Sequence, residues 1–149
     1  MLYLDIGSSA VITVSDFKEF ANIVSSEFDV RIEAVLKEAA LRIAEYSDMA
    51  MLPATIQLEG EGDEVRLYQH PVTEVVSVED KNGGVSLIDS SVVEDDMVRL
   101  PYECRYKVEY TSTPLAANVA RYLTYIYEMA SAIYDGNTDE QTKVYNRIP

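Results

Sequence analysis

The residue types that most often carry chemistry are scarce in this chain and far apart. The single histidine, His70, precedes Pro71 between two candidate strands, and the single cysteine, Cys104, starts a run in which alternate residues are apolar. A catalytic histidine needs a nucleophile or an orienting carboxylate beside it, and no spacing in the sequence brings one into reach. One cysteine forms neither an internal disulfide nor a cysteine-rich zinc site. We therefore interpret His70 as a structural or surface residue and Cys104 as a buried, unreactive thiol.

Carboxylates are the second chemical candidate, and they gather in two short runs, EGEGDE at 59–64 and EDD at 94–96. The acidic residues of these runs are Glu59, Glu61, Asp63, Glu64, Glu94, Asp95 and Asp96. Neither run has the register of oxygen donors, closed by a glutamate, that a calcium loop requires. We interpret the first run as a solvated loop and the second as a turn. The sequence predicts no catalytic residue, no metal ion and no cofactor, so it does not indicate an enzyme.

The charge of the chain is strongly negative, with 26 acids against 12 bases and a net charge of −14. Residues 55–113 contribute most of the excess, because they hold 13 acids and 5 bases. No basic stripe is present to neutralise phosphates, which argues against ordinary nucleic-acid binding and favours repulsion of DNA. An acidic surface that only keeps the protein soluble explains the charge equally well.

Length and hydropathy indicate one domain without a membrane segment. The chain has 149 residues, an ordinary length for a single domain. No apolar run approaches the roughly 18 residues that a membrane span needs. Residues 1–14 lack the basic start of a signal peptide. The single cysteine fits a reducing, cytosolic setting.

Apolar residues recur with helical spacing at both ends of the domain. Residues of about 15–48 read as a pair of helices, the first capped by Ser15 and presenting Phe17, Phe20 and Val24 on one face. The second, from about residue 29, carries the strongest apolar stripe in the chain.

A long C-terminal helix is predicted over residues 114–134. Thr113 is the candidate N-cap and Pro114 the candidate first helical residue, where a missing N–H costs nothing. Gly136 lies where a C-terminal cap is expected.

Between the helices, residues 55–110 change to a period of two, which predicts short strands. Turn residues separate them, with Asn82-Gly83 the clearest hairpin signal. Short strands joined by tight turns favour an antiparallel meander or small sandwich. The sequence therefore predicts an α+β fold over residues 1–136. Residues 137–149 are mostly polar, and we expect them to form an extended C-terminal arm.

Eleven tyrosines and no tryptophan are unusual for a chain of this size. Tyr125 lies off the apolar stripe of the C-terminal helix, and Tyr127 lies at its margin. An exposed tyrosine on a helix is often a partner contact, since it buries a large area at a small entropic cost. Ordinary packing within the chain is the alternative for both residues.

The order and wording of these elements resemble the head–tail connector proteins of tailed bacteriophages. The resemblance covers about residues 15–134 and rests on DVRIEAVLKEAALRIAEYSD, VRLYQHPVTEVVSVED, DDMVRLP and YKVEYTSTPLAANVARYLTYIYEMASAIY. The last stretch is similar to the closing pattern of the family, a Y-x-V-x-Y strand, a turn with proline and a long helix. It departs from that pattern where TST replaces the usual glycine after the strand.

The resemblance implies a structural virion protein without enzymatic activity, made in the host cytoplasm and located at the neck between capsid and tail. Its partners would be the portal ring, neighbouring copies in a ring of about twelve, and the next neck or tail protein. DNA would pass through the channel without specific binding, and the acidic runs would face that channel or the next ring.

The resemblance also gives the C-terminal arm a role as the portal-binding element. A free polar segment can order itself on a partner. Its candidate contacts are Lys143, Val144, Tyr145, Arg147 and Ile148. One alternative from another class stays open: a stand-alone acidic module of the DNA-mimic type that binds a basic partner.

Overall fold

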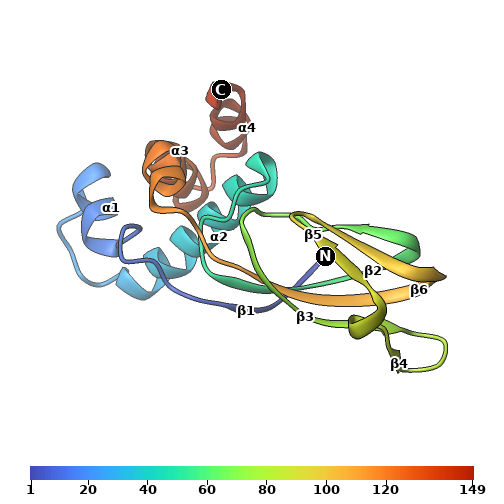
Figure 1. Cartoon of the computed structure of the whole chain (residues 1–149). Helices are drawn as coiled ribbons and strands as arrows, with labels where there is room; N and C mark the ends of the chain where they lie inside the picture. The colour runs from blue at the N-terminus through green and yellow to red at the C-terminus, as the bar shows by residue number, and fades with distance from the viewer.

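A computed structural model describes all 149 residues and has the predicted α+β fold. The helices are α1 (Val14–Phe20), α2 (Asp29–Ser47), α3 (Ala116–Tyr134) and α4 (Thr138–Arg147). The strands are β1 (Leu2–Ile6), β2 (Ala54–Arg66), β3 (Val72–Asp80), β4 (Val85–Ser86), β5 (Val92–Glu94) and β6 (Met97–Ser112), and a short 3-10 turn, η1, covers Ile88–Ser90. The helices gather at one end of the molecule, and the curled sheet extends away from them (Figure 1). None of the helices combines the length and hydrophobicity of a membrane span.

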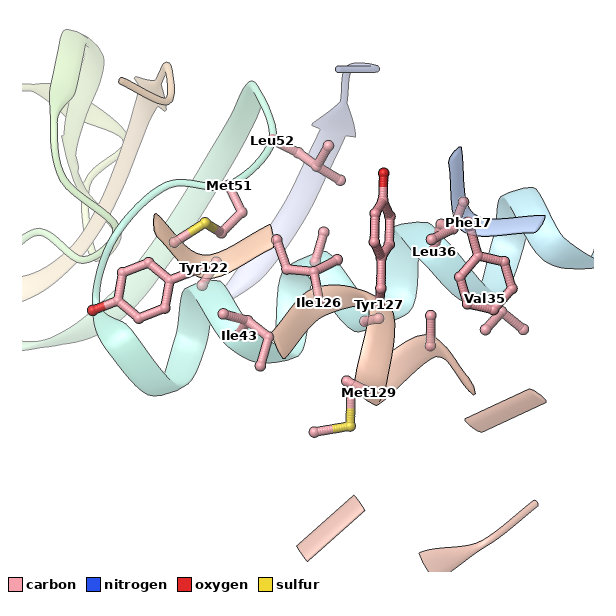
Figure 2. Packing of buried hydrophobic residues seen from close by; sticks show 14 of the residues in the cluster. Phe17, Val35, Leu36, Ile43, Met51, Leu52, Tyr122, Ile126, Tyr127 and Met129 are labelled. Atoms are coloured by element: carbon pink, nitrogen blue, oxygen red, sulfur yellow. The ribbon is translucent and has the colours of Figure 1, made fainter. Parts of the chain in front are cut away.

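The helical end is built on α2 and α3, which pack along each other. Their apolar stripes meet in one layer, in which Ile43 of α2 lies near Ile126 of α3 (Figure 2). Phe17 from α1 and Val144 from α4 close the two flanks of this layer, and both are buried. The apolar residues whose spacing of about 3.6 predicts α2 and α3 are thus the residues that these helices bury.

The sheet is antiparallel throughout, in the order β1-β2-β6-β3-β4, with β5 added beside β6. The long strand β6 is its centre, because it pairs with β2, β3 and β5. A hydrophobic cluster separate from the helical one fills the curl of the sheet; its fully buried members include Ile56, Val78, Val108 and Tyr110. The chain therefore has two cores, one between helices and one within the sheet.

The run EGEGDE is part of β2, so its interpretation as a loop is wrong. Gly60 lies opposite Tyr106, and a side chain at Gly60 would overlap the Tyr106 ring. Gly62 adopts φ +139 at a register shift. After this bulge the inward-facing positions change from even to odd, so that Leu58 and Val65 are both buried. Gly60 leaves space for the Tyr106 ring, and Gly62 allows the bulge. Glycines among acidic residues are also typical of loops, which is why the composition led to the wrong prediction.

The two ends of the molecule are joined by polar contacts around Asp48, which ends α2 in a left-handed conformation. Its carboxylate accepts the backbone N–H of Gln69 at 2.9 Å and pairs with Arg66 at 3.1 Å. His70 Nε2 lies 3.4 Å from the same carboxylate. His70 is therefore part of the junction between the helices and the sheet.

Tyr3 of β1 forms a second link across this junction. Its hydroxyl donates to Glu45 at 3.0 Å and accepts from the side-chain amide of Gln69. Burial raises the pKa of Tyr3 above its ordinary value. Beside it, the Tyr110 hydroxyl bonds both the backbone N–H and the carbonyl of Tyr68, each at 3.1 Å.

Two predicted helix starts are displaced. Thr13, rather than Ser15, caps α1 by accepting the N–H of Asp16 at 3.2 Å. Helix α3 begins at Ala116 after Leu115, and Thr113 instead bonds Thr73 through its hydroxyl at 3.0 Å. Both caps lie two residues from the predicted positions. Thr13 caps α1 through the predicted kind of side-chain hydrogen bond, whereas Leu115 makes no such bond at the start of α3.

Candidate assembly surfaces

The C-terminal segment folds back as a helical hairpin, so the prediction of an extended arm over residues 137–149 is wrong. The N–H of Asn137 bonds the carbonyl of Ala132 at 2.8 Å, and the N–H of Gly136 bonds that of Ile133 at 3.0 Å. With Gly136 at φ +68, this is the capping arrangement in which glycine ends a helix. The Asn137 side chain then accepts the N–H of Glu140 at 3.1 Å and starts α4.

Apolar contacts hold α4 against α2 and α3. Val144 is 1% exposed within the helical core. The ring of Tyr145 lies 5.0 Å from that of Tyr46, and burial raises the Tyr145 pKa. Ile148 packs against the same cluster. Three of the five predicted portal contacts therefore face the chain's own interior.

The two charged candidates lie on the outside of α4. Lys143 pairs with Glu140 at 2.9 Å, which lowers the Glu140 pKa, and it is exposed. Arg147 lies 3.6 Å from Glu128 of α3 and 3.6 Å from Glu140. These two cations and their neighbours form the outward face of the hairpin.

The tyrosines of α3 differ from each other in environment. Tyr127 is buried at 6% exposure, stacks near Phe17 and Phe20, and donates to the carbonyl of Val11 at 3.3 Å. It is a core residue, which removes it from the candidate partner contacts. Tyr125 is half-buried and packs beside Tyr122.

The acidic runs are offset along the sheet, and Glu64 at the end of the first run lies opposite Arg99, which also pairs with Val92 of β5. Glu94 ends β5 opposite Met97, in register with Arg66, whereas Glu61 lies opposite Arg105, farther along β2 and β6. The structure therefore does not bring the two runs together into one site.

Some of these acids are already paired. Lys81 contacts Glu59 at 2.9 Å and lowers its pKa, and Arg99 lies 3.8 Å from Glu64. Asp96 lies 3.7 Å from His70. The remaining members are exposed carboxylates without an ion pair in the chain, namely Glu61, Asp63, Glu94 and Asp95. Asp95 forms the predicted turn, with φ +46.

The only cysteine lies inside the sheet. Cys104 is buried, and burial raises the pKa of its thiol, which disfavours the reactive thiolate. His70 approaches two carboxylates, Asp48 at 3.4 Å and Asp96 at 3.7 Å, and no nucleophile joins either pair among the hydrogen bonds of the junction.

Two apolar residues of α2, Val30 and Ala34, are exposed, and Val30 is 83% exposed. Leu41 follows on the same side of the helix but is partly buried and packs against the helical core. Val24, predicted to lie on a buried face, is 99% exposed. The signal was available in the spacing of four and seven residues, but the stronger core stripe of the same helix obscured it.

Comparison with known proteins gives matches only at the level of structure. No protein-family model matches the chain, and no curated protein matches it in sequence. Among solved structures, a chain from "Virion of native gene transfer agent (GTA) particle" aligns at TM-score 0.65 and 16% identity, covering 90% of this chain and 83% of that chain. A chain from "Neck of native GTA particle computed with C12 symmetry" aligns at TM-score 0.61 and 14% identity, covering 91% and 84%.

A third chain, from "Neck of empty GTA particle computed with C6 symmetry", aligns at TM-score 0.56 and 14% identity over 89% of this chain and 84% of that chain. All three likenesses extend over nearly the whole chain, so they include the helices as well as the sheet. They agree with the resemblance to head–tail connector proteins. This chain has the fold of chains found in the necks and virions of gene transfer agent particles.

Proposed function

We propose that the chain is a structural protein of a phage-like neck, an adaptor that forms a ring of about twelve copies between the portal and the tail. Its role is structural rather than enzymatic, and it acts in the assembled virion. DNA passes through the ring without specific binding. The observation that carries the proposal is the fold shared with neck chains over about nine-tenths of the chain.

The charge distribution supports a channel role. A wall that attracted the duplex would slow its passage, because each neutralised phosphate adds to binding. Glu61 and Asp63, at the bulge of β2, are exposed carboxylates without an ion pair. We propose that this end of the sheet faces the channel or the next ring. Glu94 and Asp95, at the other end of the acidic region, would then face away from it.

The C-terminal hairpin is the proposed portal contact, in a form that differs from an extended arm. Val144, Tyr145 and Ile148 hold α4 on the helical core, while Lys143 and Arg147 lie on its outside. Because the backbone of a helix packed on its own domain is already ordered, binding through its charged side chains loses little conformational entropy. We propose that this outward face meets acidic groups on the portal.

The test of portal docking uses Lys143→Glu combined with Arg147→Gln. These exposed changes remove both cations of the outward face, which also contact Glu140, and leave Val144 in place, so the fold should be retained. Portal rings of the same virus should retain the unsubstituted chain in a pull-down and lose this variant. Arg105→Glu, an exposed charge reversal on β6, is the matched control and should bind normally. Equal retention of all three proteins would refute the proposed contact.

A further inference from the structure

The turn between β3 and β4 contains an asparagine followed by a glycine, Asn82-Gly83, at the end of the sheet away from the helices (Figure 1). All residues of the turn, 81–84, are exposed. The pair suits a tight turn, because asparagine and glycine accept the backbone angles that such turns need. It also places a backbone nitrogen with little steric cover beside the side-chain amide carbon of the preceding residue. An asparagine in this setting can lose its side-chain nitrogen as ammonia.

The hydrogen bonds of the turn leave the reacting groups free. The backbone N–H of Asn82 donates to Asp80 Oδ1 at 3.0 Å, and that of Gly84 donates to the Asp80 carbonyl at 2.9 Å. Between them, the N–H of Gly83 has no acceptor within the chain, and the side chain of Asn82 makes no hydrogen bond. The turn is therefore held around Asp80, while the attacking nitrogen and the amide that it attacks are unrestrained.

The other four asparagines of the chain lack this combination. They precede Ile23, Val119, Thr138 and Arg147, and each of these residues has a side chain that crowds its own nitrogen. The N–H of Ile23 also donates to the Lys18 carbonyl at 2.8 Å. The N–H of Val119 donates to the Leu115 carbonyl at 3.1 Å. Asn82 is thus the exposed asparagine whose following residue has both a free N–H and no side chain.

From this geometry we infer that Asn82 is a site of spontaneous deamidation. The Gly83 nitrogen forms a bond to Cγ of Asn82 while the Cγ–Nδ2 bond breaks, and the side-chain nitrogen leaves as ammonia with the proton from Gly83. Water then opens the cyclic imide. Its hydroxyl adds to one of the two carbonyl carbons of the ring, and its proton returns to the Gly83 nitrogen. No group is oxidised or reduced, and water is the only co-reactant.

Either product changes the end of the sheet. Both openings create a carboxylate, which is ionised at neutral pH and adds one negative charge to a chain that already carries −14. Opening at Cγ gives aspartate. Opening at the backbone carbonyl gives isoaspartate, whose backbone runs through Cβ and Cγ and is longer by one carbon. Because the turn joins strands that pair Asp80 with Val85, the longer backbone should weaken that pairing.

The test is a time course on the purified full chain in mildly alkaline buffer, which favours loss of the Gly83 amide proton. Samples are digested with pepsin at low pH, and the peptides that contain each of the five asparagines are analysed by mass spectrometry. The Asn82 peptide should gain about one mass unit, because OH replaces NH₂, and should separate into two products of equal mass. The other four peptides are internal controls. An unchanged Asn82 peptide, or equal gains at all sites, would overturn the assignment.

Gly83→Ala tests the attack by the backbone nitrogen. Gly83 lacks the positive φ of Gly84, and an added Cβ would lie 3.3 Å from Cγ2 of the exposed Val85, which can move aside. The fold should therefore be retained, and amide exchange of β6 checks this. Because the methyl group crowds the attacking nitrogen, the Asn82 rate should fall by about tenfold. An unchanged rate would mean that water attacks the side chain directly, which contradicts the inference.

The unfolded chain tests the contribution of the turn. No hydrogen bond of Gly83 has to break before attack, so unfolding in urea should raise the Asn82 rate by less than about tenfold. A larger rise would show that the folded turn protects Asn82, and the inference from its geometry would be wrong.

Discussion

Val144 is the residue that decides whether α4 belongs to the folded domain. Its side chain is 1% exposed and lies in the helical core. Val144→Ala removes the equivalent of two methylene groups, worth about 1.6 kcal/mol at 0.8 kcal/mol per group. A residual cavity adds to this. We expect a total cost of roughly 2 kcal/mol.

This cost should appear as local opening of α4. Helix α4 is the last element of the chain and is joined to α3 only through the turn at Gly136. The hairpin can therefore open without unfolding the sheet. A loss of roughly 2 kcal/mol corresponds to about a thirtyfold rise in the open population, at 1.4 kcal/mol per factor of ten.

Amide hydrogen exchange of residues 141–147 measures that population. The amides should exchange about thirtyfold faster in Val144→Ala, while those of β6 stay unchanged. Thr142→Ala is the matched control, since Thr142 is exposed on the same helix and only donates to the Thr138 carbonyl at 3.2 Å. Equal exchange in both variants would show that α4 is not packed through Val144, and the folded hairpin would be wrong.

Three further predictions concern the sheet. Burial raises the pKa of Tyr110 from 10.0 to about 12, so the unfolded chain loses this proton at a lower pH than the folded chain does. The free energy of unfolding should therefore fall as the pH rises between these two values. In urea titrations, Tyr110→Phe should reduce that fall. Gly62→Ala forces a side chain into φ +139 and should cost roughly 1–2 kcal/mol in the same assay; no loss would contradict the bulge. Glu61→Lys with Asp63→Lys should change stability by less than about 0.5 kcal/mol yet slow DNA release from assembled particles, and unchanged release would argue against a channel-facing position.

Sequence alone predicts the helices and strands in which the spacing of apolar residues matches the spacing of the buried residues. Helices α2 and α3 and the change to alternating strands follow from where apolar residues recur, because those residues face a core. The predicted cap at Gly136 is confirmed for a local reason, since a left-handed position strongly favours glycine. Such features depend on neighbours within a few residues.

The errors arise where distant contacts decide the structure. EGEGDE reads as a loop, yet Gly60 is required by the ring of Tyr106, which is far away in sequence. The polar segment after Gly136 becomes a helix because Val144 and Tyr145 reach residues of α2. An isolated helix of this length is marginal in water, so tertiary packing determines its state.

The candidate surfaces were predictable only in part. The acidic residues were visible in the sequence, but their separation along the sheet depends on the pairing of β2 and β6. The helical spacing places Tyr127 at the margin of the core stripe of α3, but Phe17 and Phe20 of α1 pack against its ring and cover it. The exposed residues Val30 and Ala34 are recognisable once the opposite face of α2 is known to be buried.

The most direct measurement of the adaptor role is electron microscopy of the purified full chain mixed with portal rings of the same virus. If the protein is the proposed adaptor, a second ring of this protein should stack on the portal, with about twelve copies around the axis and the outward face of α4 at the portal surface. Bare portal rings beside free monomers, at concentrations well above those in an infected cell, would contradict it.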